Sequence, residues 1–141
     1  MITRADLYPL FDPSLSLSAD QARAIVGALQ DIAESDGVHA EEQALIAELI
    51  ADYNLDLDDQ ATVAKVTPAA LARALVDPTL RKLAVQTGVM VAMADGAISD
   101  VERARVVDYA RALGMDDEAY AAIEALIVAW MRSGDAAPMF E

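Results

Sequence analysis

The sequence predicts an all-α fold of about seven helices, built from two pseudo-symmetric helix–loop–helix units. The 141 residues match the usual size of one domain, and 55% of them are apolar, with only two Phe, one Trp and four Tyr. This composition favours closely packed helices over sheets. No segment alternates with the two-residue period of a strand. Two Asp-Gly steps, Asp36-Gly37 and Asp95-Gly96, each lie between two helical patterns, which predicts the internal repeat.

Residues 1–17 contain two prolines and are interpreted as an N-terminal arm. The first helix is expected to begin at Ser18, because Ser18 and Gln21 form a capping-box pattern. Gln30 and Asp31 are expected on its outer face, and Asp36-Gly37 ends it. The second helix is expected from about residue 40 to residue 53. The apolar positions of the first helix recur at helical spacing: Ala22, Ile25, Val26, Leu29, Ile32 and Ala33.

The middle of the chain predicts three further helices. An acidic turn precedes a short helix over residues 60–65. Thr67-Pro68 and Asp77-Pro78 each place a capping residue before a proline at the first helical position, which starts helices over 69–76 and 79–94. The second of these is apolar nearly all round, which is typical of a central helix. Gly88 in its middle lowers helix propensity and therefore predicts a close contact with another helix.

Two helices complete the predicted domain. One runs over 100–113 and ends at Gly114, and the other runs over 117–132 with Asp116 as its cap. We divide the chain into the arm 1–17, a helical domain 18–133 and a flexible C-terminal tail 134–141. The last helix carries an apolar stripe that is expected in the core: Tyr120, Ile123, Leu126, Ile127, Trp130 and Met131.

The formal charge of −14 is placed unevenly along the chain. Residues 1–59 hold thirteen acidic and two basic side chains, so most of the excess negative charge lies there. Such a surface repels nucleic acid and anionic lipid, and it attracts cations or a basic partner. The alternative interpretation is that the negative charge serves only to keep an alanine-rich protein in solution. The longest apolar run, residues 89–94, is too short for a membrane span. The first residues lack the layout of a signal peptide and there is no cysteine, so we expect a cytoplasmic protein.

The second Asp-Gly loop resembles half of a calcium loop. Asp95, Gly96 and Glu102 match the fifth, sixth and twelfth positions of an EF-hand, but Val91 and Met93 stand where the first and third ligands belong. A weaker site would form if the carboxylates of one loop met carboxylates of the other unit or of a neighbouring molecule. Oxygen ligands without thiolates favour calcium, magnesium or manganese.

A purely structural interpretation explains most of the same residues. Gly96 serves as a left-handed residue after one helix, and Ser99 with Glu102 forms a capping box for the next. It does not explain the aspartate at the end of each preceding helix, where a carboxylate opposes the helix dipole. The only histidine, His39, is interpreted as a surface or capping residue. With one histidine and no cysteine, most nucleophile–base arrangements are unavailable, and we predict that the protein is not an enzyme.

The second Asp-Gly loop and its flanks read Ala92-Met-Ala-Asp95-Gly96-Ala-Ile98-Ser99-Asp-Val-Glu102. This stretch resembles the motif of the TerB-like family of tellurite-resistance and stress proteins. Asp36-Gly37-Val38 with Glu42 is a looser copy, shorter by one residue. The resemblance covers roughly residues 18–132. It implies a domain of about seven helices with internal pseudo-twofold symmetry, a link to tellurite resistance and chemical stress, and binding of divalent metal at acidic residues. Carried over to this sequence, the implied ligands are Asp36, Glu42, Asp95 and Glu102.

Two functions follow as expectations. In the first, a TerB-like stress protein binds a divalent cation or a protein partner, such as a membrane-associated complex, through its acidic loops. In the second, the chain is a structural interaction or dimerisation module with no metal site, which docks a protein or a second copy through the apolar arm residues 7–11. Neither function requires nucleic acid or direct insertion into a membrane.

Overall fold

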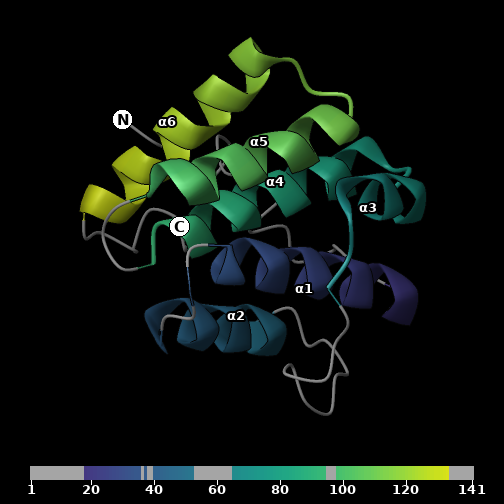
Figure 1. The fold of residues 1–141 in the computed structure, drawn as a ribbon, viewed down its shortest axis with the longest axis horizontal. Helices are drawn as coiled ribbons and strands as arrows, with labels where there is room; N and C mark the ends of the chain where they lie inside the picture. The colour runs from purple at the N-terminus through teal and green to yellow at the C-terminus, as the bar shows by residue number, and fades with distance from the viewer. Residues whose placement is uncertain (1–17, 36, 38–39, 53–64, 95–97, 134–141) are drawn as a thin grey trace.

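The computed structural model describes residues 18–35, 37, 40–52, 65–94 and 98–133, and every regular element in this part of the chain is a helix. The all-α prediction is therefore confirmed over these ranges. The short helix predicted over 60–65 lies outside them except for Lys65, which is not helical, and so do the arm and the tail. The helices are α1 (Ala19–Glu34), α2 (Ala40–Asp52), α3 (Pro68–Ala74), α4 (Pro78–Ala92), α5 (Asp100–Ala112) and α6 (Asp117–Ser133) (Figure 1).

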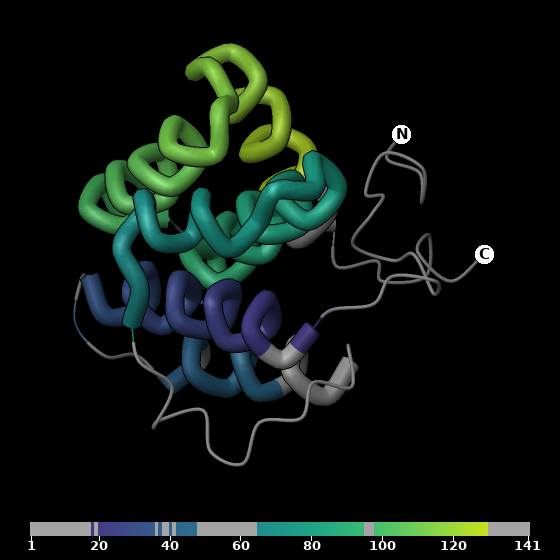
Figure 2. Tube along the Cα trace, turned by 90° about the vertical axis from the view of Figure 1, so that its right-hand side faces the viewer, coloured from purple at the N-terminus to yellow at the C-terminus, as the bar shows by residue number. Residues whose placement is uncertain are grey.

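Helix α4 is the centre of the fold, as its apolar composition predicts. It packs against α1, α2, α5 and α6, while α1 packs against α2, α3, α4 and α5. Figure 2 shows α1 and α2 on one side of the molecule and α3, α5 and α6 on the other. Every residue of α4 from Leu83 to Ala92 is buried. Among the described residues, no helix has the length and apolar character needed to cross a membrane.

The helix starts follow local capping chemistry. Ser18 accepts a hydrogen bond from the Gln21 N–H (3.1 Å), and the Gln21 side chain accepts one from the Ser18 N–H (2.9 Å), which confirms the capping box. Thr67 and Asp77 cap α3 and α4, each with proline at the first helical position. Asp116 caps α6 by accepting from the Ala119 N–H (2.7 Å). Capping satisfies N–H groups that have no partner within the helix, so these short signals determine where helices begin.

The predicted close contact at Gly88 is confirmed. A Cβ atom at this position would lie 3.2 Å from Ile32 Cδ1 on α1 and 3.6 Å from Val106 Cγ1 on α5. The absence of a side chain therefore lets three helices approach one another at this point of the core. Gly114, predicted to end α5, has φ of 88° and lies in the left-handed region that favours glycine.

One expectation for α1 is wrong. Gln30 was expected on the outer face, but it is buried, with 3% of its surface exposed. Asp31 is only partly exposed and contacts α5. The reason is that four helices surround α1, so the buried side of α1 is wider than the apolar stripe in its sequence. The stripe of α6 is confirmed where it is described, since Tyr120 and Ile127 are buried and Ile123 and Leu126 pack against the core.

The guanidinium of Arg81, in the first turns of α4, joins the carboxyl ends of two other helices. It donates to the carbonyls of Ala72 (3.0 Å) and Leu75 at the end of α3, and to that of Leu113 (3.1 Å) at the end of α5. Terminal carbonyls carry the partial negative charge of the helix dipole, so a cation is favourable there. Sequence reasoning did not assign this role to Arg81.

Candidate functional site

Two of the four predicted ligands, Glu42 and Glu102, take the same place in their helices. Each is the third residue of its helix, α2 and α5 respectively. Both side chains are buried, with 0% of Glu42 and 2% of Glu102 exposed. The other two predicted ligands, Asp36 and Asp95, lie outside the described residues. The convergence of all four carboxylates therefore stays a prediction.

Glu102 is held from one side by the residue that caps its helix. The Ser99 hydroxyl oxygen accepts a hydrogen bond from the Glu102 N–H (3.1 Å) and the hydroxyl group donates to Glu102 Oε1 (3.2 Å). Within the ranges that the structure describes, no donor reaches Glu102 Oε2, although that atom is buried. The two oxygens of one carboxylate therefore have different environments. Ile98, immediately before the cap, packs against the core.

Glu102 lies in the first turn of α5, at the amino end of the helix. The amino end of a helix carries a partial positive charge that is favourable for a carboxylate, but this effect is typically below about 1 kcal/mol. Removing an ionised carboxylate from water costs considerably more, which is why buried charges are usually paired or coordinate a metal. In the described parts of the chain, no three Asp, Glu or His side chains lie close enough together to hold a metal ion. These described parts alone therefore do not provide a complete ligand set.

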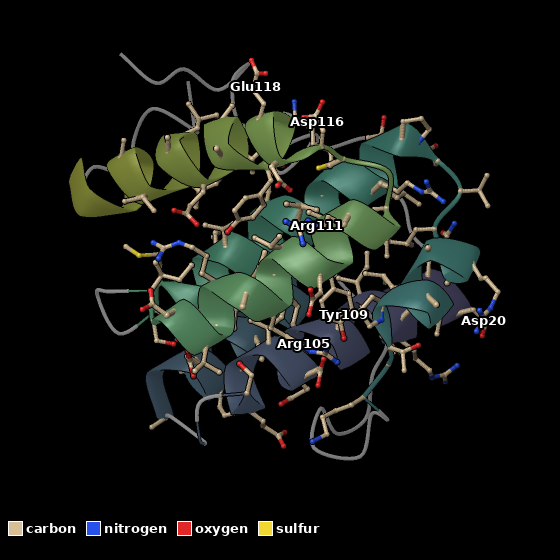
Figure 3. All side chains as sticks on the ribbon, turned by 45° about the horizontal axis from the view of Figure 1, so that its top comes forward. Asp20, Arg105, Tyr109, Arg111, Asp116 and Glu118 are labelled. Carbon is tan, nitrogen blue, oxygen red and sulfur yellow. The ribbon has the colours of Figure 1, made fainter. Side chains whose placement is uncertain are left out.

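A second polar cluster joins α1 to α5. Asp31 Oδ2 accepts from the Arg105 guanidinium and from the Tyr109 hydroxyl (2.6 Å), and that hydroxyl also contacts the Val66 carbonyl before α3. The Arg105 side chain also lies over the Tyr109 ring, 5.4 Å from its centre. Figure 3 shows both side chains on the part of α5 that faces α1. Burial, and then the hydrogen bond to Asp31, raise the pKa of Tyr109 well above its ordinary value, so the phenol stays neutral.

A third polar cluster joins α5 to α6. Glu124 accepts from Arg103 Nε (2.9 Å) and from the Tyr120 hydroxyl (2.6 Å). Burial raises the pKa of Glu124, but the hydrogen bonds from Arg103 and Tyr120 outweigh it, and the net pKa lies below the ordinary value. At the other end of α5, the exposed Arg111 and Asp117 form a bidentate salt bridge, in which Arg111 Nε and Nη2 donate to the two carboxylate oxygens of Asp117 at 3.0 Å each.

The clusters around Asp31 and Glu124 each join two helices. They differ from the Glu102 site, because the Asp31 and Glu124 carboxylates each have an arginine partner. Sequence reasoning missed them. The one available signal was the spacing of four residues between Arg105 and Tyr109, which places both on one face of a helix. It also missed the burial of Glu42 and Glu102, because capping residues are ordinarily at the surface.

Compared with known proteins, the chain finds no match among family models, curated proteins or solved structures. The resemblance to the TerB-like family therefore rests on the repeated sequence motif.

Proposed function

We propose that this chain is a non-enzymatic, TerB-like stress-response protein that binds a divalent cation at the acidic connections before α2 and α5. The proposed ligands are Asp36, Glu42, Asp95 and Glu102. The observation that carries the proposal is the buried carboxylate of Glu102, at the third position of α5, whose Oε2 atom accepts no hydrogen bond within the described residues. Glu42 is also buried and holds the same position in α2. Calcium, magnesium and manganese are the candidate cations, because all ligands are hard oxygen atoms.

Capping alone does not account for a buried carboxylate. At the start of α1 the equivalent position holds Gln21, a neutral residue that is only partly buried and still completes a capping box. At the start of α5 the side chain at this position is ionisable and turns to the Ser99 hydroxyl. A neutral residue satisfies the helix end at lower cost, because burying an ionised group requires compensation. A bound cation would provide that compensation.

The arrangement of the helices supports a two-unit architecture. Helices α2 and α5 begin at residues 40 and 100, so the two helix starts are as far apart in the sequence as Glu42 and Glu102 are. Each of these helices packs against the helix before it, and α1 packs against α4. Each unit would therefore present one acidic connection. A basic protein partner, such as a component of a membrane-associated complex, would be drawn to the same connections, and its binding would weaken with salt.

The test is a titration of the chelator-treated full chain with calcium, magnesium or manganese. Calcium and magnesium binding is followed by amide NMR shifts, and manganese binding by line broadening. We expect saturable changes confined to residues near 36–42 and 95–102, and their loss in Asp95→Asn and in Glu102→Gln. Asp20→Asn is the matched control, because the Asp20 side chain is 98% exposed and is not a proposed ligand. Changes that are diffuse, do not saturate and disappear in modest salt would refute the cation site.

A further inference from the structure

We draw no further inference here: the strongest candidate, the outer face of α6 on which Ala122, Ala125 and Ala129 are exposed, is a stripe of small side chains, and nothing in the described part of the chain shows what covers it.

Discussion

Replacing Gly88 by alanine tests how tightly α4 is packed between its neighbours. In a helix interior, alanine is more favourable than glycine by about 1 kcal/mol. The new Cβ would lie 3.2 Å from Ile32 Cδ1, closer than the roughly 3.5–4.0 Å of a good carbon–carbon contact. Ile32 is 2% exposed and Val106 is 0% exposed, so both side chains are enclosed by the core and cannot move out toward solvent. Overpacking of this kind costs about 1–3 kcal/mol, and we expect Gly88→Ala to lower the free energy of unfolding by about 1 kcal/mol.

The same substitution should change sign when its obstacle is removed. Ile32→Val deletes the Cδ1 atom and alone costs about 1 kcal/mol. In that background, Gly88→Ala has no close contact with Ile32 Cδ1 and should raise the free energy of unfolding by about 1 kcal/mol. Urea denaturation of the natural chain, both single variants and the double variant gives the coupling energy, which we expect to be about 2 kcal/mol.

Two outcomes would contradict this reasoning. Gly88→Ala could stabilise the natural chain as much as it stabilises the Ile32→Val protein, which would mean that the 3.2 Å contact relaxes freely. Alternatively, the coupling energy could fall below about 0.5 kcal/mol, the usual range for sites that do not interact. Either result would show that glycine is not required for the approach of α1 to α4.

Two further predictions concern the polar clusters. Tyr109→Phe removes the hydroxyl that contacts Asp31 and Val66, and it should lower the free energy of unfolding by about 1–2 kcal/mol in a urea titration. The control is Asp108→Asn, which removes an exposed partner of Arg105 and should change the free energy of unfolding by less than about 0.5 kcal/mol. The net pKa of Glu124 in the folded protein lies below its ordinary value of 4.5. The stabilisation that the ionised Glu124 side chain provides is therefore complete above about pH 4.5, and it is lost as the pH falls through the folded-state pKa. Denaturation midpoints between about pH 3 and 6 should therefore decline less steeply in Glu124→Gln than in the natural chain, and parallel curves would contradict the assignment.

The elements that sequence reasoning located correctly are those determined by a few adjacent residues. Ser18, Thr67, Asp77 and Ser99 each cap a helix through a hydrogen bond to an N–H two or three residues ahead, so the sequence contains the whole interaction. The central position of α4 follows from its apolar composition in the same way. These signals are local and do not depend on how the helices pack.

The residues that sequence reasoning missed depend on the number and direction of neighbouring helices. Gln30 is buried because α1 is surrounded, and Asp31 meets Arg105 across 74 positions of sequence. For the candidate site, the motif placed Glu42 and Glu102 at helix starts but gave no indication that both are buried. A capping pattern specifies hydrogen bonds to the backbone of its own helix, and burial is decided by the rest of the fold.

The contacts of Arg81 have an evolutionary consequence. All three of its acceptors are main-chain carbonyls, those of Ala72, Leu75 and Leu113, so no side-chain replacement at these positions removes an acceptor. Replacements that preserve the packing of the buried Leu75 and Leu113 side chains would therefore also keep the connection between α3, α4 and α5. Arginine itself is much less replaceable, because lysine lacks the planar fork of donors that reaches several carbonyls at once. An alignment would then show one invariant arginine without any covarying partner, although that residue joins three helices.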